Sequence, residues 1–300
     1  MVAMSKMLAA DARGTRPARV TGPLRDNWRV SGAIEFDPDL YRGTAEYYDR
    51  FRVLYPTEVM ADLVDRAQPS GGGRLLDLAC GTRQIAFAIA EHFREVWAVD
   101  QEPGMIKVVR DKAEIAGAGH VRAVVSSAEG LDAPPDAFEL VAIGNAFHRL
   151  RRDAVAANAL RWLQPSRCIA LLWSTGSLRG EREWQLVLSD VLARWTTKVG
   201  AQSRVPQDWE QVRLKRPDTA VLTAAGFQPV RSARFFVEHD WTVDALLGYV
   251  YSTSALPKGA LGDHAEAFES DLRHELDPYT TGGPLRATID FAYELACRPA

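Results

Sequence analysis

The fold is constrained most by one stretch, which reads RLLDLACGTRQIAFAIAEHFREVWAVD. Residues 75–78 form a short apolar run that Asp77 interrupts, as expected for a buried parallel strand. A turn of small residues follows, and apolar side chains then recur at helical spacing over residues 84–93. A second apolar run, residues 96–99, ends in Asp100. The order strand, glycine turn, helix, strand and acid predicts an α/β fold built on a parallel sheet.

The same order has a chemical use. Small residues let the backbone approach a ligand closely, and the start of a helix offers unpaired N–H groups and the positive end of a dipole. An acid at the end of the second strand can accept two hydrogen bonds from a ribose diol. We therefore expect a nucleoside-containing ligand over the carboxyl edge of the sheet. A dinucleotide fingerprint is disfavoured, because it places Gln84 where a small residue would pack helix against strand.

The glycine turn resembles the first motif of the class I S-adenosylmethionine-dependent methyltransferases, an acid-bearing apolar strand followed by G-x-G-x-G. Here the motif reads DLACGTR, so the middle glycine is kept, and Arg83 puts a long cation either beside the cofactor or out in solvent. The resemblance implies a Rossmann-like, doubly wound, mostly parallel seven-stranded sheet with helical lid insertions. It also implies cofactor contacts at Asp77, Ala79, Cys80, Gly81 and Asp100.

The segment before the first strand carries the pattern Y-x-x-x-A-x-x-Y-D-x-x-R, which begins at Tyr41. It resembles the subgroup of these enzymes that includes trans-aconitate methyltransferase-like proteins, in which the segment folds over the cofactor. The resemblance places Tyr41, Tyr48 and Arg52 near the methionyl end of the cofactor or near the substrate. The alternative is that the aromatic rings only pack the segment onto the sheet. A helix is predicted to follow from Thr57, which would cap it.

Further cofactor contacts are implied after the second, third and fourth strands. The resemblance places Gln101 and Met105 near the adenine. Relatives read G-D-A-E after the third strand, whereas this chain reads SSAE, so Ser127 stands in place of the acid. Ser127 or the backbone N–H of Ala128 would bind the base instead. Asn145, which follows the fourth strand, completes the predicted cofactor contacts.

His148 is the first candidate for a catalytic base. The fourth strand, predicted over residues 138–143, ends in GNAFHRL, where the subgroup commonly reads A-F-H-W-F, and Arg149 replaces the tryptophan. Open α/β sheets bind ligands at this edge, and an unperturbed imidazole has a pKa of about 6.5. A base is needed when the methyl acceptor carries a proton at neutral pH. Tyr41 is the second catalytic candidate, and an orienting or packing role is the alternative for His148.

Motif content divides the chain into three parts. Residues 1–33, with scattered glycine, proline and arginine, are predicted to be a flexible tail or an arm that docks on the same or a neighbouring subunit. Residues 34–175 are predicted to form the S-adenosylmethionine-binding core with an N-terminal helical cover. Residues 176–300 would supply the remaining core strands and helical lid inserts, one of them with an apolar stripe over residues 180–199.

Composition narrows the class of protein. The 300 residues are 47% hydrophobic, which is ample for a packed core, and the net charge of -3 gives no basic footprint for nucleic acid. Three widely spaced cysteines indicate neither a disulfide framework nor a metal site. The sequence shows no run of about 18 apolar residues that would span a membrane, and its start lacks the core of a signal peptide. We therefore expect a soluble cytoplasmic protein without membrane or nucleic-acid partners, and homo-oligomerisation is left open.

The predicted function is transfer of a methyl group from S-adenosylmethionine to an oxygen, nitrogen or carbon atom of a small organic acceptor, with secondary metabolites as one class of acceptor. Methyl transfer from a sulfonium is an in-line displacement, so the enzyme mainly positions the acceptor and excludes water. Two alternatives remain. One is a nucleotide-dependent oxidoreductase, and the other is an inactive S-adenosylmethionine-binding protein, which the departures at Arg83 and Ser127 keep open.

Overall fold

The computed structural model describes residues 36–82, 84–175, 178–206 and 208–300. All of them belong to one unit of the chain, residues 34–300. The tail predicted over residues 1–33, and the side chain of Arg83, lie outside the described residues.

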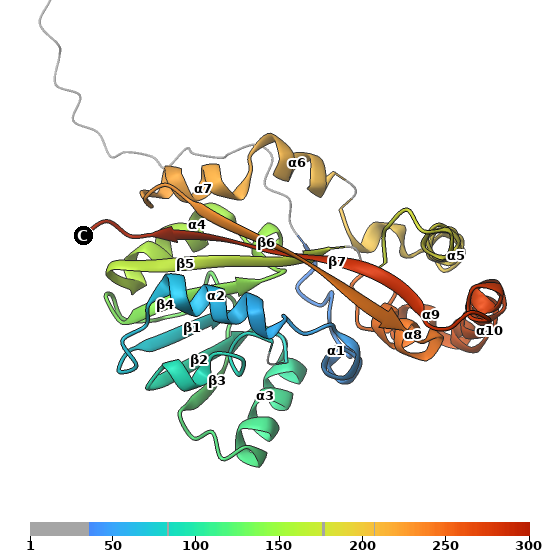
Figure 1. The fold of residues 1–300 in the computed structure, drawn as a ribbon, viewed down its shortest axis with the longest axis horizontal. Coiled ribbons are helices and arrows are strands. Elements are labelled where there is room, and N and C mark those ends of the chain that lie inside the picture. The colour runs from blue at the N-terminus through green and yellow to red at the C-terminus, as the bar shows by residue number, and fades with distance from the viewer. Residues whose placement is uncertain (1–35, 83, 176–177, 207) are drawn as a thin grey trace, which may run out of the picture. The chain divides into compact units, whose positions relative to one another are not determined.

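A sheet of seven strands runs through this unit (Figure 1). The strands are β1 (Arg74–Leu78), β2 (Glu95–Asp100), β3 (Val121–Val125), β4 (Phe138–Gly144), β5 (Leu163–Thr175), β6 (Arg231–Trp241) and β7 (Leu285–Cys297). Their order across the sheet is β3-β2-β1-β4-β5-β7-β6. Strands β1 to β5 are parallel to their neighbours in that series, whereas β7 runs antiparallel to both β5 and β6. The predicted Rossmann-like, mostly parallel seven-stranded sheet is confirmed.

The helices of the described residues are α1 (Ala45–Phe51), α2 (Thr57–Ala67), α3 (Pro103–Ile115), α4 (Arg152–Trp162), α5 (Glu183–Lys198), α6 (Trp209–Lys215), α7 (Asp218–Ala225), α8 (Val243–Tyr251), α9 (Lys258–Leu261) and α10 (Ala265–Leu276). Thr57 was predicted to cap α2, but Pro56 holds the cap position and Thr57 is already the first helical residue. None of the helices in this part of the chain is long and apolar enough to cross a bilayer.

Apolar helices cover both faces of the parallel half of the sheet, because successive residues of a strand point to opposite faces. Leu75 belongs to the hydrophobic cluster that contains the buried sides of α2 and α3. Leu76 and Leu78 belong to a second cluster, which contains the buried sides of α4 and α7. Because β1 is buried on both faces, it is almost continuously apolar. Its side chains and those of the covering helices form the core.

Two groups of helices follow β5. α5, α6 and α7 lie between β5 and β6 in the chain, and α8, α9 and α10 lie between β6 and β7. α5 packs on α10, and the indole Nε1 of Trp195 donates to Oδ2 of Asp271 at 2.6 Å. α5, α8, α9 and α10 gather at the end of β6 and the start of β7 (Figure 1). The apolar stripe predicted on α5 is buried at Trp184, Leu188, Val191 and Trp195. Its role as a lid stays a prediction.

The helix predicted over residues 84–93 is wrong, because the described part of this segment forms successive turns that end in a short 3-10 helix, η1 (Ala90–His92). The N–H of Ala86 donates to Oδ2 of Asp77 at 2.8 Å, so a carboxylate accepts where a regular helix would offer a carbonyl. The apolar residues are nevertheless buried as their spacing predicts: Ile85, Ala86, Ile89, Ala90 and Phe93. Turns with a similar period therefore satisfy the same pattern.

Two of the three cysteines form a disulfide, which corrects the inference that no such bond exists. The antiparallel register of β5 and β7 sets Cys168 opposite Cys297, and the bond joins them across 129 positions of sequence. Spacing along the chain could not reveal this pair, since the two strands become neighbours only through the order of the sheet. The cysteine pattern therefore no longer supports the predicted cytoplasmic location, because disulfides persist mainly in oxidising environments.

Candidate functional site

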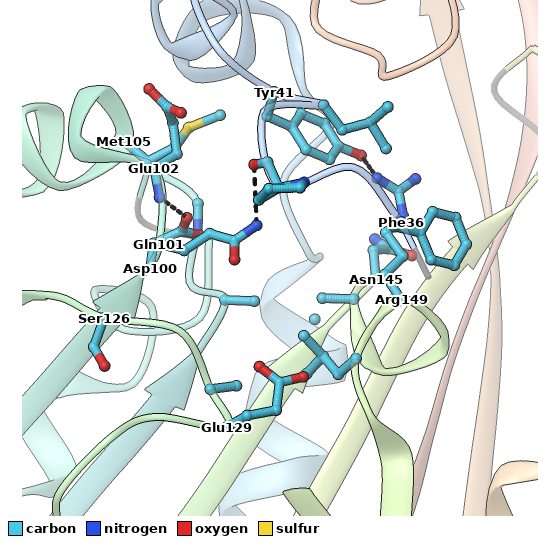
Figure 2. A pocket seen from close by; sticks show the side chains of 18 of the residues that line it. Phe36, Tyr41, Asp100, Gln101, Glu102, Met105, Ser126, Glu129, Asn145 and Arg149 are labelled. Carbon is cyan, nitrogen blue, oxygen red and sulfur yellow. Dashed lines mark hydrogen bonds between the residues drawn. The ribbon is translucent and has the colours of Figure 1, made fainter. Parts of the chain in front are cut away.

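A pocket of about 310 Å³ opens at the carboxyl edge of the sheet (Figure 2). Its walls come from the segment before α1, the turn after β1, the start of α3, and the segments that follow β2, β3 and β4. The residues are Phe36, Asp37, Pro38, Leu40, Tyr41, Tyr48, Ala79, Gly81, Asp100, Gln101, Glu102, Met105, Ser126, Ala128, Glu129, Gly144, Asn145, Ala146, Arg149, Leu150 and Arg151. The order of strands reverses between β1 and β4, which is where open α/β sheets bind ligands.

Asp100 ends β2 and lines the pocket. Its Oδ2 accepts a hydrogen bond from the N–H of Gly81 at 2.9 Å, and its Oδ1 accepts one from the N–H of Glu102 at 2.9 Å. Burial raises the pKa of Asp100, against the backbone donors, which lower it. Since a carboxylate has about four acceptor positions, both oxygens keep room for further donors. The acid predicted to bind a ribose diol is therefore held in a fixed orientation by the backbone.

Gly81 allows an aromatic side chain to pack on the turn after β1. Its φ of 59° lies in the left-handed region, which favours glycine. A Cβ atom at this position would lie 2.9 Å from Cε1 of Tyr48, closer than van der Waals contact permits. The packing of Tyr48 therefore requires a residue without a side chain at Gly81, as does any ligand that approaches the turn.

The other residues of the glycine motif divide into lining and supporting positions. Ala79 lines the pocket, whereas Asp77 and Cys80 are buried and are not among its lining residues. Burial raises the pKa of Asp77 to about 8. Oδ2 of Asp77 accepts from Ala86, and Oδ1 has no partner among the described residues. Asp77 thus fixes the segment after the turn and does not itself reach the pocket.

The segment before β1 contributes an aromatic wall. Tyr41 and Tyr48 both line the pocket, and their ring centroids lie 6.1 Å apart in a nearly perpendicular arrangement. The guanidinium of Arg52 lies 4.7 Å from the ring centroid of Tyr48, and its Nη2 donates to the carbonyl of Ser252 at 2.9 Å. Arg52 is not among the lining residues, so the structure places it behind the aromatic wall, where it ties α1 to the loop after α8.

The cofactor contacts predicted after β2, β3 and β4 line the pocket with one exception. The lining positions are Gln101, Met105, Ala128 and Asn145. Ser127 is absent from the wall, and its Oγ accepts from the N–H of Gly130 at 3.0 Å. Its neighbour Ser126 lines the pocket instead. Comparison with the family motif G-D-A-E puts Ser127 at the position of the acid. No pattern in the sequence indicated Ser126.

His148 lies in a second, smaller cavity of about 120 Å³, which shares Asn145 with the larger pocket. Its ring stacks on Trp209 of α6, with the centroids 4.5 Å apart. Its Nε2 accepts a hydrogen bond from Nε of Arg149 at 3.1 Å. Burial lowers the pKa of His148 to about 2, and the charges of Arg149, Arg213 and Arg152 act in the same direction. The imidazole is therefore neutral at physiological pH, and its Nε2 lone pair is already engaged.

Arg149 links the two cavities. It lines the larger pocket, where its Nη1 donates to the hydroxyl of Tyr41, as Figure 2 shows. Burial by itself would raise the pKa of Tyr41, but the charges of Arg149 and Arg52 and the hydrogen bonds to the phenol outweigh it, and the pKa is lowered. Both predicted catalytic side chains, Tyr41 and His148, are thus bonded to the same guanidinium.

Comparison with known proteins agrees with this geometry. Residues 75–166 match a family described as a methyltransferase domain. Over these residues the chain is similar to the class I S-adenosylmethionine-dependent methyltransferases. Its resemblance to the trans-aconitate methyltransferase-like subgroup stays a prediction.

The named relatives of this chain are distant. An uncharacterised methyltransferase of Mycobacterium bovis is 27% identical over 167 residues, and the match covers 55% of this chain and 64% of the relative, slightly less than two thirds of its length. Nocamycin O-methyltransferase of Saccharothrix syringae is 25% identical over 268 residues, which cover 83% of this chain and 94% of the relative. A solved structure from Anaeromyxobacter dehalogenans, assigned as a type II methyltransferase, is 23% identical and covers 83% of this chain and 100% of its own, with a TM-score of 0.57. This structural likeness shows a shared fold.

The larger pocket brings together most of the predicted site residues: Tyr41, Tyr48, Ala79, Gly81, Asp100, Gln101, Met105, Ala128 and Asn145. Their roles in binding and catalysis stay predictions, as does the role of His148. The sequence did not assign Phe36, Glu129 or Arg149 to the site. The signal for Arg149 was present as a departure from the family's tryptophan, whereas nothing marked Phe36, which precedes every motif.

Proposed function

We propose that this methyltransferase moves a methyl group from S-adenosylmethionine to a small organic acceptor in the larger pocket. The observation that carries the proposal is the hydrogen bond from the N–H of Gly81 to Oδ2 of Asp100, at 2.9 Å. It joins the glycine turn after β1 to the acid that ends β2, beside a pocket of about 310 Å³. A pocket of this size lies within the usual range for small ligands. The relation to an O-methyltransferase over most of its length favours the same class of reaction.

The residues present fit an adenosyl cofactor. Asp100 keeps acceptor positions for ribose hydroxyls, and the backbone at Ala79 and Gly81, with φ of 52° and 59°, lines the pocket. Gln101 and Met105 offer polar and apolar surface for a base. The cofactor, when bound, supplies a methyl group on a positively charged sulfur. The faces of Tyr41 and Tyr48 would stabilise that charge, because aromatic rings attract cations.

The chain itself contributes orientation and exclusion of water. The segment before α1 forms a cover in which Leu40 is buried and Tyr41 lines the pocket. Nη2 of Arg204 donates to the carbonyl of Leu40 at 3.2 Å, so the residues after α5 hold this cover in place. A closed pocket favours displacement at the methyl carbon, because it positions the acceptor in line and keeps water away.

Calorimetry tests the cofactor assignment. The parent should bind S-adenosylmethionine and S-adenosylhomocysteine and should not bind NAD. Asp100→Ala should weaken binding by about 1.5–3 kcal/mol, the scale of a hydrogen bond to a charged group. Asp100→Asn, which keeps one acceptor oxygen, should lose less. Asp263→Ala, an exposed acid far along the chain, serves as the matched control.

Three outcomes would oppose the proposal. Unchanged affinity in a folded Asp100→Ala variant would remove Asp100 from the site. Binding of NAD in preference to S-adenosylmethionine would favour a nucleotide-dependent oxidoreductase. Tight S-adenosylmethionine binding without methyl transfer to any fraction of a metabolite extract would favour an inactive binding protein.

A further inference from the structure

The wall of the pocket formed by η2 (Phe147–Arg149) carries a cation that lacks an acidic partner. The guanidinium of Arg149 donates to the hydroxyl of Tyr41 and to Nε2 of His148. Among residues 36–82, 84–175, 178–206 and 208–300, no carboxylate forms an ion pair with it. An arginine has five N–H donors, and two groups of this protein engage Arg149, so donors remain for a ligand.

Three other partly buried arginines of the described chain are paired with acids, whereas Arg52, which has no acid partner among the described residues, is not among the residues that line the pocket. Arg152 and Arg213 share the buried carboxylate of Asp218, at 2.9 Å and 2.8 Å. Arg167 binds Glu139 at 2.9 Å. A half-buried cation without such a partner is costly, because burial removes the water that would otherwise solvate its charge. Arg149 therefore lines the pocket with no acid of the described residues to neutralise its charge.

We propose that the anion that neutralises this charge is a carboxylate of the methyl acceptor, that Arg149 binds it, and that this carboxylate receives the methyl group. The inference rests on the proposed methyltransferase function and specifies its acceptor class, a carboxylic acid, and its product class, a methyl ester. Guanidinium and carboxylate match in shape, since both are planar and can form two parallel hydrogen bonds.

The charges of the pocket orient such an acceptor. Asp100 and Glu102 lie on the side opposite Arg149 in Figure 2 and accept backbone N–H groups, as does Glu129. These acids favour a cation on their side and disfavour a second anion there. The ring of Phe36, whose centroid lies 5.9 Å from the guanidinium carbon of Arg149, offers an apolar surface for the body of the acceptor.

The hydrogen bonds of Arg149 also argue against an acceptor that must lose a proton. His148, the first side chain predicted as a base, uses the lone pair of its Nε2 to accept from this guanidinium, so it cannot take a proton there. A carboxylic acid needs no base, because its ordinary pKa of about 4 leaves it ionised at neutral pH. Alcohols, by contrast, would require a free base beside the reacting oxygen.

The reaction then balances without proton transfer. A carboxylate oxygen attacks the methyl carbon with one lone pair, and the carbon–oxygen bond forms as the carbon–sulfur bond breaks. The electrons of the broken bond go to sulfur, which becomes a neutral thioether. The negative carboxylate and the positive sulfonium are consumed together, so attraction between them favours the encounter. Arg149 acts by binding and orientation.

Binding of matched acids and amides tests the inference. The protein is saturated with S-adenosylhomocysteine and titrated with benzoate and benzamide, and with 2-naphthoate and 2-naphthamide, by calorimetry or ligand-observed NMR. Each acid should bind the parent at least about tenfold more tightly than its amide, the equivalent of one charge-assisted hydrogen bond. Arg149→Met should abolish this preference, and Arg149→Lys should keep part of it. Arg110→Met, which removes an exposed arginine of α3, should leave it unchanged.

If no acid binds the parent more tightly than its amide, or if Arg149→Met keeps the preference, the inference is overturned. Cofactor binding and methyl transfer by the parent separate this result from failure of the proposed function, because that function fails only if the parent does not bind the cofactor or transfers no methyl group. The chemical class of product gives a second readout. Methyl label transferred to a carboxylate is released as methanol by mild alkali, whereas label that resists alkali would also overturn the inference and leave methyl transfer standing.

Discussion

At the scale of single residues, Arg149 influences both groups that it contacts. Burial and then the charge of Arg149 depress the pKa of His148. At Tyr41 burial raises the pKa, but the charges of Arg149 and Arg52 and the hydrogen bonds to the phenol together outweigh it. The imidazole is kept neutral, and the phenol is shifted towards ionisation. The protonation of both therefore depends on one side chain that departs from the family pattern.

The depressed pKa of His148 predicts that acid destabilises the fold. The unfolded imidazole binds a proton below about pH 6.5, whereas the folded imidazole, next to Arg149, Arg213 and Arg152, does so only near pH 2. Above about pH 6.5 the neutral imidazole lowers the unfolding free energy by nothing. Below that pH the unfolded state gains protons that the folded state cannot bind, so the unfolding free energy falls with the pH. His148→Gln should reduce the pH slope of the unfolding free energy by up to about 1.4 kcal/mol per pH unit.

Urea unfolding measures how the unfolding free energy changes with pH. The range from about pH 4.5 to pH 7 spans the ordinary histidine pKa and the interval below it. His120→Gln, at an exposed histidine before β3, is the control and should not change the slope. Equal slopes in the parent and in His148→Gln would show that the imidazole is not held neutral. Because this pKa is depressed, titration of His148 should cause no change near pH 6.5 in the pH profile of the methyl-transfer rate.

Sequence reasoning succeeded for residues whose role is local. Asp100 ends a strand and Gly81 sits in the turn before it, so both could be placed from strand ends and small residues alone. Arg149 could not be placed, because its partner Tyr41 lies 108 positions away. Their contact depends on how the segment before α1 returns to the sheet, and no pattern in the sequence specifies that path.

At the scale of elements, the turn after β1 and the aromatic wall depend on each other through Gly81. Gly81→Ala should lower the unfolding free energy by about 1–3 kcal/mol, because the residue needs a left-handed φ and its Cβ would meet Tyr48. Gly117→Ala is a matched control: its φ is 63°, and a Cβ atom added there would meet nothing within 4 Å.

The difference between these two substitutions isolates the cost of the contact. Adding Tyr48→Ala to Gly81→Ala should recover that difference, because the clash disappears while the strained φ remains. Chemical denaturation measures Gly81→Ala, Gly117→Ala, Tyr48→Ala, the double variant and the parent. If Gly81→Ala costs no more than Gly117→Ala, the packing of Tyr48 does not require the glycine.

The helices after β5 are predicted to close over the acceptor. Hydrogen exchange in α5 and α10 should slow when S-adenosylhomocysteine and an acceptor acid are both bound, since Arg204 connects the residues after α5 to the pocket cover at Leu40. α4, which packs on the far side of the sheet, is the internal control. Unchanged protection in α5 on ternary-complex formation would favour a plain structural helix.

The segment 84–93 shows the limit of periodicity at this scale. Apolar spacing correctly predicted which side chains are buried, but a chain of turns can bury the same positions. The carboxylate of Asp77 decides between the two, because it accepts from Ala86 and competes with main-chain acceptors. A buried acid nine positions away is not part of any helix pattern.

At the scale of the whole molecule, the order of the sheet decides which distant segments meet. The parallel half followed from the strand–turn–helix order and its family resemblance. The position of β7 between β5 and β6 did not follow from any sequence pattern, and the disulfide was missed for the same reason.

The disulfide between Cys168 and Cys297 predicts a large contribution to stability. Replacing both cysteines by serine should lower the unfolding free energy by about 3–5 kcal/mol, since the closed loop is long. Cys80→Ala is the control for loss of a thiol alone. Thiol labelling of the unfolded parent checks the bond directly: one cysteine should react before reduction and all 3 after it. Full reactivity without a reductant would contradict the pairing.

The position of β7 also bears on how the chain is made. β6 precedes β7 in the sequence, yet β7 separates it from the rest of the sheet. On the ribosome, β6 therefore emerges with no strand to pair with, and it waits until β7, Leu285–Cys297, has followed. During this interval its hydrogen-bonding groups and side chains such as Phe236, 64% exposed even in the folded protein, are open to other chains. The yield of folded protein should therefore depend on how quickly translation passes through the helices between the two strands.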